Sequence, residues 1–251
     1  MHSRTGRRRQ AGFLLEGPRA IADALDRGVV FQELVVTEAS ESVAAEWQRA
    51  GRLDGRTAVY RATIAELAAL ADTTTPQGLL AVGSLPPLSL MALPAAPAGL
   101  ILWLDAVQDP GNFGTLLRTL AAVGGTIALC GAGTVDPYNP KALRAAAGAT
   151  FGLAVAAGVA PADALAWLDG HGVPVVALTA GAPNLFDATL PRGPLALVVG
   201  NEAAGLHAEI EARAALVVGL PMAPGIDSLS VAVAGSVALY ALAHHLAPAP
   251  A

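Results

Sequence analysis

Short apolar runs recur along the second half of the chain and alternate with segments of helical pattern. Each run has the length of a buried strand rather than that of a long helix. The runs lie near residues 100–104, 126–130, 153–156, 173–178, 195–199 and 215–220. Strands that alternate with helices predict a mainly parallel sheet covered on both faces, so we expect an α/β domain.

The first 85 residues predict a smaller α/β domain. The helical patterns are Gly17 to Arg27, Glu41 to Arg49 and Thr63 to Leu70, and the strand patterns are Phe31 to Val36 and Leu79 to Val82. Residues 86–97 are rich in proline and predict a semi-rigid linker. The expected organisation is therefore a domain at 1–85, a linker at 86–97 and a larger domain at 98–251.

Composition favours a globular protein with substantial cores, because 54% of the 251 residues are hydrophobic and only 14% are charged. Every apolar run of near-transmembrane length is interrupted by Gly, Pro or polar residues. The N-terminal arginines are not followed by an apolar signal core. A single cysteine, Cys130, excludes an intramolecular disulfide. We therefore expect a soluble cytoplasmic protein without a membrane partner.

Three segments rich in Gly, Pro and polar residues follow strand patterns in the second half. The first, residues 109–118 (DPGNFGTLLR), begins with a turn cluster that can cap a helix, expected from Phe113 to Val123. Arg118 is the only charge in that apolar helix. It is either partly buried and paired with a carboxylate such as Asp105 or Glu202, or it serves a function.

The other two segments also stand at junctions between a strand and a helix. In residues 199–206 (VGNEAAGL), Gly200 allows close approach of a ligand, and Glu202 lies in a turn where it can cap a helix or pair with Arg118. In residues 220–230 (LPMAPGIDSLS), prolines and a glycine predict an irregular loop. Ser228 is expected to be the N-cap of a long helix from Leu229 to Leu246, and it can also be a reactive group.

In this order, the three segments resemble the motifs of the SpoU (TrmH-like) branch of the SPOUT RNA methyltransferases. The resemblance covers roughly residues 98–246. It implies transfer of a methyl group from S-adenosylmethionine to a ribose 2′-hydroxyl of structured RNA. Residues 13–17 and 75–81 are similar to the beginning and end of the ribosomal-protein-like substrate-binding domain that many SpoU enzymes carry, which favours ribosomal RNA as the substrate.

The resemblance also implies a fold and a cofactor site. It implies a C-terminal trefoil knot and a homodimer to which the last helix contributes. The cofactor is expected to lie bent in the knot, held mostly by backbone, at Thr179, Ala180, Gly200, Leu220, Met222 and Leu229.

For catalysis, the resemblance places Asn112 and Arg118 at the target ribose, with Glu202 holding the arginine. Arg118 acts either as the base for the 2′-hydroxyl or, because a guanidinium stays protonated, as an electrostatic stabiliser. Ser228 and Ser230 complete the expected catalytic set. The family usually ends its third motif Ser-Leu-Asn, whereas this chain has Ser228-Leu229-Ser230, which departs from the family at the last position.

The charge distribution adds a possible RNA contact. The net charge is −5, and all of the deficit lies after residue 85, where five basic residues accompany ten acidic ones. The basic residues Arg7, Arg8 and Arg9 form either a solvated mobile tail or a phosphate-binding segment. No His/Cys spacing predicts a metal site. Two alternatives stay open: a methyltransferase acting on transfer RNA, and an RNA-binding module without turnover.

Overall fold

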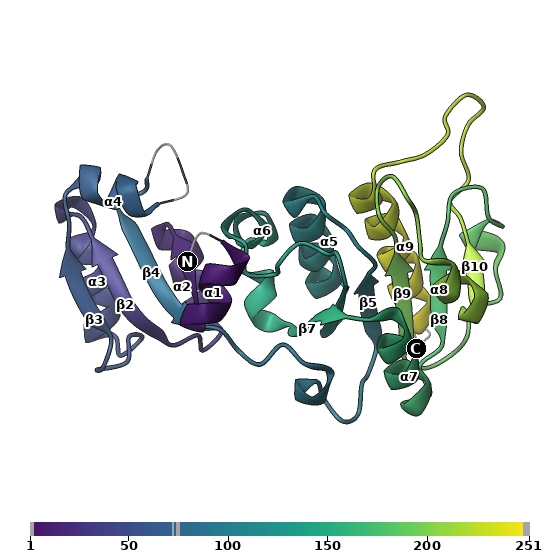
Figure 1. The fold of residues 1–251 in the computed structure, drawn as a ribbon, viewed down its shortest axis with the longest axis horizontal. Helices are drawn as coiled ribbons and strands as arrows, with labels where there is room; N and C mark the ends of the chain where they lie inside the picture. The colour runs from purple at the N-terminus through teal and green to yellow at the C-terminus, as the bar shows by residue number, and fades with distance from the viewer. Residues whose placement is uncertain (1–2, 72, 74–75, 248–251) are drawn as a thin grey trace. The chain divides into compact units, whose positions relative to one another are not determined.

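The computed structural model describes residues 3–71, 73 and 76–247; Thr75, the first residue of the second domain motif, lies outside these ranges. The chain divides into two compact units (Figure 1). The first unit comprises Met1–Pro86 and Tyr138–Phe151, and the second comprises Pro87–Pro137 and Gly152–Ala251. Each unit contains its own sheet.

The first unit is built on a four-stranded sheet of order β1-β4-β2-β3. The strands are β1 (Gly12–Glu16), β2 (Phe31–Val36), β3 (Ala58–Arg61) and β4 (Leu79–Ser84), and the helices are α1 (Arg4–Gln10), α2 (Pro18–Asp26), α3 (Glu41–Arg49) and α4 (Ile64–Leu70). Strand β4 is antiparallel to both its neighbours, whereas β2 and β3 are parallel. Strand β3 has little apolar pattern because it is a largely exposed edge strand.

Residues 138–151 belong to the first unit although they come from the second half of the chain. This segment contains α6 (Pro140–Ala146). The Phe13 ring centroid lies 5.0 Å from that of Tyr138 and 5.4 Å from that of Phe151. The aromatic core of the first unit is thus completed by a segment that the sequence placed in the other domain.

The N-terminal arginines lie in a helix, which does not fit the mobile tail that was one of the two alternatives for this segment. Helix α1 begins after Ser3, whose Oγ accepts a hydrogen bond from the Gly6 N–H at 3.0 Å. Arg7 faces inward and is only 1% exposed, whereas Arg8 and Arg9 are exposed. The helical period separates the three side chains, because consecutive residues point in different directions.

Most of the proline-rich stretch packs on the second unit instead of serving as a free spacer. The Ala157 N–H of β7 (Ala154–Val159) donates to the Leu88 carbonyl at 2.9 Å. Leu93 is buried in the core of this unit, and Leu90 packs against that core. The apolar residues between the prolines therefore anchor the segment.

The second unit confirms the prediction of an α/β fold with a mainly parallel sheet. Its six strands have the order β10-β8-β9-β5-β6-β7, and every neighbouring pair is parallel. Besides β7, the strands are β5 (Leu100–Leu104), β6 (Ile127–Gly131), β8 (Val175–Leu178), β9 (Leu195–Val199) and β10 (Leu216–Val218). Strand β9 lies between β8 and β5, although it follows β8 in the chain.

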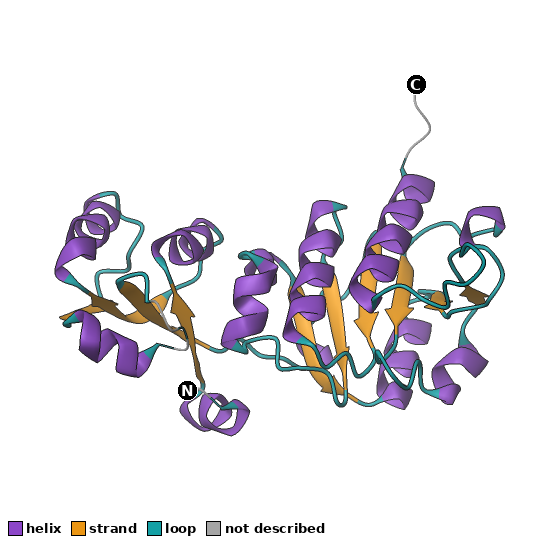
Figure 2. Ribbon diagram, turned by 90° about the horizontal axis from the view of Figure 1, so that it is seen from above, coloured by secondary structure: helices purple, strands orange, loops and turns teal. Residues whose placement is uncertain are grey.

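Helices cover both faces of this sheet (Figure 2). Helices α5 (Pro110–Ala122) and α9 (Val231–Leu246) pack together on one face, and α7 (Pro161–Gly170) and α8 (Ala208–Arg213) on the other. Alternate residues of each strand, such as Ile101 and Trp103 of β5, point into the core beneath α7 and α8. Short 3-10 helices lie at Glu38–Ser40, Leu90–Ala92, Ala149–Gly152 and Leu185–Asp187. No helix in the described ranges is long and apolar enough to cross a membrane.

Candidate active site

The sheet topology brings the three sequence motifs to one edge. The first motif follows β5, the second follows β9 and the third follows β10, while Thr179 follows β8. These four strands are parallel and adjacent, so their carboxyl ends lie side by side. Ligands of open α/β sheets bind at the carboxyl ends of the strands, so a ligand site is expected at this edge.

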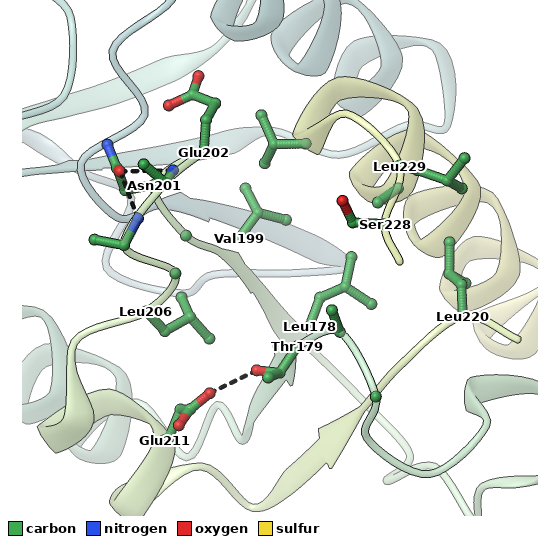
Figure 3. A pocket seen from close by; sticks show the side chains of 18 of the residues that line it. Leu178, Thr179, Val199, Asn201, Glu202, Leu206, Glu211, Leu220, Ser228 and Leu229 are labelled. Atoms are coloured by element: carbon green, nitrogen blue, oxygen red, sulfur yellow. Dashed lines mark hydrogen bonds between the residues drawn. The ribbon is translucent and has the colours of Figure 1, made fainter. Parts of the chain in front are cut away.

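A cavity of about 480 Å³ lies at this edge (Figure 3). It is lined by residues 178–181, residues 199–206, Glu211 of α8, and Leu220, Met222, Ser228, Leu229, Val231 and Ala234. The lining includes all the residues expected to hold the cofactor: Thr179, Ala180, Gly200, Leu220, Met222 and Leu229. Glu202 and Ser228 also line it, whereas Asn112, Arg118 and Ser230 do not.

The second motif forms a tight backbone loop on one side of the cavity. A Cβ added at Gly200 would lie 2.4 Å from the Gly205 carbonyl carbon and 2.6 Å from the Leu206 nitrogen, so only glycine fits there. The Asn201 Oδ1 accepts hydrogen bonds of 2.9 Å from the N–H groups of Ala203 and Ala204. These contacts fix the loop and leave its backbone close to the cavity.

Asn201 also ties the second motif to the loop that follows β5. Its Nδ2 donates to the Ala106 carbonyl at 2.8 Å. Ala106 has a φ of 56°, in the left-handed region that a residue with a Cβ seldom adopts. Such local strain persists where surrounding contacts over-determine the backbone, often at functional sites.

Glu202 connects the second motif to the start of α5. Its Oε1 accepts hydrogen bonds from the Asn112 Nδ2 at 3.1 Å and from the Asp109 N–H at 3.3 Å, and its Oε2 accepts one from the Gln108 N–H at 3.4 Å. Burial raises the pKa of the Glu202 carboxyl, but the hydrogen bonds from Asn112 and the backbone outweigh burial and lower the pKa below its ordinary 4.5. The carboxylate is the form that these donors stabilise.

Arg118 is exposed on α5 and is not paired as the sequence suggested. Among the described residues, neither Asp105 nor Glu202 forms an ion pair with it. Asp105, only 1% exposed, instead accepts hydrogen bonds from the backbone N–H and the Nδ1 of His207, both at 2.8 Å. The two carboxylates are occupied by backbone and side-chain donors, and the guanidinium faces solvent.

The third motif has a different helix start from the one expected. Helix α9 begins at Val231, and its N-cap is Ser230, whose Oγ accepts a hydrogen bond from the Val233 N–H at 3.4 Å. The prediction that Ser228 is the N-cap is therefore wrong. The irregular loop extends through Leu229, and Ser228 faces the cavity instead.

One polar pair in the cavity was missed from the sequence. The Thr179 Oγ1 donates to the Glu211 Oε1 at 2.7 Å, as Figure 3 shows. Glu211 lies on the short polar helix α8, where an acidic residue is ordinary, so the sequence carries no signal for its position. The position depends on α8 packing against β8.

Comparison with known proteins decides the family. Residues 99–240 match the model of the SpoU rRNA Methylase family, and residues 1–81 match that of the MRM3-like substrate binding domain. The chain belongs to the SpoU rRNA methylase family.

Relatives in this family match over nearly the whole chain. The 23S rRNA (guanosine(2553)-2′-O)-methyltransferase RlmP of Bacillus subtilis is 33% identical over 244 residues, which cover 96% of this chain and 92% of RlmP. The SpoU methyltransferase AviRb of Streptomyces viridochromogenes, solved in complex with AdoMet, superposes with a TM-score of 0.86 at 26% identity, covering 97% of this chain and 93% of AviRb. An AdoMet-bound rRNA methyltransferase from Sinorhizobium meliloti gives a TM-score of 0.85 at 27% identity, covering 98% and 92%.

Proposed function

We propose that this protein transfers a methyl group from S-adenosylmethionine to a ribose 2′-hydroxyl of ribosomal RNA. The observation that carries the proposal is the cavity between the second and third motifs, with the Asn112–Glu202 pair beside it. The names of its relatives support the same chemistry, since RlmP and the 23S rRNA (uridine(2479)-2′-O)-methyltransferase of Streptomyces viridochromogenes both act on a ribose of ribosomal RNA.

The cavity residues fit S-adenosylmethionine. A volume of about 480 Å³ is in the range of small-molecule sites. Leu220, Met222 and Leu229 offer apolar side chains for a flat base, and the loop around Gly200 offers backbone groups at close approach. When bound, the cofactor supplies an electrophilic methyl group.

The residues outside the cavity position the RNA. Glu202 fixes the Asn112 amide at the first turn of α5, and Asn112 then orients the target ribose through its remaining donor and acceptor capacity. Arg118 is exposed on the same helix and binds an RNA phosphate or stabilises the developing alkoxide. A guanidinium stays protonated, so we assign Arg118 this electrostatic role rather than that of a base.

The first unit supports ribosomal RNA over transfer RNA as the substrate. Residues 1–81 match a substrate-binding domain, and Arg8 and Arg9 of α1 are exposed for phosphate contacts. Arg7 is excluded from this role by its burial. A module without turnover is disfavoured because the chain keeps Asn112, Arg118 and Glu202, the residues that the resemblance places at the target ribose.

We also propose the knot that the family resemblance implies. The chain after β10 runs closely against the loop after β8: a Cβ at Gly219 would lie 2.8 Å from the Thr179 carbonyl oxygen and 2.9 Å from that of Ala182. The Leu185 N–H donates to the Gly219 carbonyl at 2.8 Å. These contacts support a chain that threads through this loop before it forms α9.

We also propose a homodimer in which α9 forms part of the interface. Val233, Val237 and Tyr240 of α9 are 49%, 38% and 60% exposed, and Phe186 beside them is 60% exposed. Large apolar side chains gathered on one face favour burial against another surface. A cytoplasmic location accords with ribosomal RNA as the substrate.

A methyl-transfer assay tests the function. Purified protein is incubated with S-adenosylmethionine carrying a labelled methyl group and with either ribosomal or transfer RNA, and the nucleosides are then separated. We expect label in a 2′-O-methylated nucleoside of ribosomal RNA. Label only in transfer RNA would support the alternative substrate. Cofactor binding without transfer to either RNA would support the module without turnover.

A further inference from the structure

Glu211 differs from Asn201 and Glu202, whose side chains also line the cavity. Asn201 is occupied by the Ala203, Ala204 and Ala106 backbone, and Glu202 by Asn112 and the backbone of the first motif. The Glu211 Oε1 accepts the Thr179 hydroxyl at 2.7 Å, and no described hydrogen bond uses its Oε2. The Thr179 contact therefore holds a carboxylate at the cavity wall with one oxygen available.

The cavity has an acidic lining. Glu202 and Glu211 both contribute to it, and none of the described residues that line it is Lys, Arg or His. Carboxylates that are partly shielded from water attract a cation more strongly than they would in bulk solvent. The cavity is therefore suited to a positively charged ligand.

The proposed methyl donor and its product differ by one positive charge. S-adenosylmethionine carries a sulfonium in addition to its ammonium and carboxylate, so its net charge is +1, whereas S-adenosylhomocysteine is neutral overall. In the transfer, a bond forms between the ribose 2′-oxygen and the methyl carbon while the bond between methyl carbon and sulfur breaks. The bonding pair returns to sulfur, and the hydroxyl proton goes to solvent. The positive charge thus leaves the cavity during turnover.

We infer that Glu211, oriented by Thr179, makes the cavity select the charged methyl donor over the neutral product. The inference rests on the proposed function. Glu211 attracts the donor before transfer and loses this attraction once the sulfonium becomes a thioether, which favours release of the product. Glu211 is thus a specificity-determining residue of the cofactor site, and Thr179 is a positioning residue that acts through it.

Isothermal titration calorimetry with S-adenosylmethionine and S-adenosylhomocysteine tests the inference. The measured quantity is the ratio of the two dissociation constants, product over donor. Glu211→Gln keeps the shape and a hydrogen-bond acceptor but removes the charge, so we expect the ratio to fall about threefold or more. Glu209→Gln is the matched control, because it removes one charge from an exposed position of the same helix that does not line the cavity. Its ratio should equal that of the wild type.

The outcomes separate the inference from the function on which it rests. If the wild type binds neither ligand, the proposed function fails. If it binds both, and Glu211→Gln leaves the ratio unchanged or weakens both ligands equally, the inference fails while the function stands. Thr179→Val keeps the charge of Glu211 but removes the hydroxyl that orients it. If Glu211→Gln does not fold, the ratio of dissociation constants measured for Thr179→Val decides the question. That ratio must fall in the same direction, and an unchanged ratio would overturn the inference.

Discussion

The Glu202 Oε1 lies 3.1 Å from the Asn112 Nδ2, so a side chain of the second motif holds one of the first motif, 90 positions earlier in the chain. The pair spans the adjacent strands β5 and β9 at their carboxyl ends. Together with the hydrogen bonds to the backbone of Gln108 and Asp109, it makes Glu202 the clamp on the loop that starts α5. Arg118 is left exposed on that helix.

These hydrogen bonds predict that Glu202 stabilises the folded protein at neutral pH and that this stabilisation is lost in acid. Because the pKa of Glu202 is lowered in the folded state, its stabilisation is present above the ordinary pKa of 4.5 and is lost as pH falls through the folded pKa. We expect Glu202→Gln to be less stable than the wild type at pH 7, and the difference to shrink below pH 4.5. Urea unfolding of both proteins across this range measures it. A difference that grows at low pH would contradict the clamp.

Gly200 is predicted to be irreplaceable. A Cβ there would meet the backbone of Gly205 and Leu206, which cannot rotate away as a side chain can. Gly200→Ala should cost about 1–3 kcal/mol of unfolding free energy, as overpacking does, and should abolish cofactor binding. Thermal unfolding and titration with S-adenosylmethionine measure the two effects.

Gly170→Ala is the control for this substitution. Gly170 ends α7, and nothing lies within 4 Å of an added Cβ. This variant should bind cofactor normally and be as stable as the wild type or more so, since alanine favours a helix. Equal cofactor affinity of the two glycine variants would show that the close approach at Gly200 is unimportant.

The arginines of α1 are predicted to act in two different ways. Arg7 is buried, so Arg7→Ala should destabilise the protein by about 2 kcal/mol or more. Arg8 and Arg9 are exposed, and replacing both with Ala should leave stability nearly unchanged. If both contact phosphates, the slope of log affinity for RNA against log salt should flatten by about 0.7–0.9 for each contact. A slope that the double substitution leaves unchanged would remove α1 from the RNA surface.

Ser230 is predicted to be replaceable by the residue that the family usually carries. As the N-cap of α9 it accepts a hydrogen bond from the Val233 N–H, and asparagine caps helices as well as serine does. Ser230→Asn should therefore keep the unfolding free energy, whereas Ser230→Ala should lower it by about 1 kcal/mol. Urea unfolding distinguishes the two. If Ser230→Ala were as stable as the wild type, the cap would contribute nothing.

The parallel sheet could be predicted because its strands are buried on both faces and read as continuous apolar runs. The runs that became β5 and β9 match the observed bounds, as do β2 and α3 in the first unit. The edge strand β3 could not be recognised in this way, since Ala58–Arg61 is mostly exposed and lacks apolar alternation. Helix α1 was not predicted for a similar reason: its inward-facing residue, Arg7, is charged, so the segment has no apolar pattern.

Contacts between segments that are far apart in the chain could not be predicted from the sequence. The motifs located the cavity because glycine-rich turns after parallel strands meet at one sheet edge. The partner of Glu202 could not be inferred, since Asn112 and Arg118 lie in the first and third turns of the same helix and either was chemically suitable. Likewise, nothing in the chain order indicated that Tyr138 and Phe151 complete the core around Phe13.

The most direct test of the proposed function is the identity of the methylated atom and the dependence of methylation on Arg118. Ribosomal RNA is treated with S-adenosylmethionine and either the wild type or Arg118→Ala, and the digested nucleosides are analysed by mass spectrometry. We predict that the wild type produces a ribose 2′-O-methylated nucleoside, and that Arg118→Ala produces none while retaining wild-type stability and cofactor affinity. Methylation of a base by the wild type would contradict the proposed function, and equal ribose methylation by the two proteins would contradict the role proposed for Arg118.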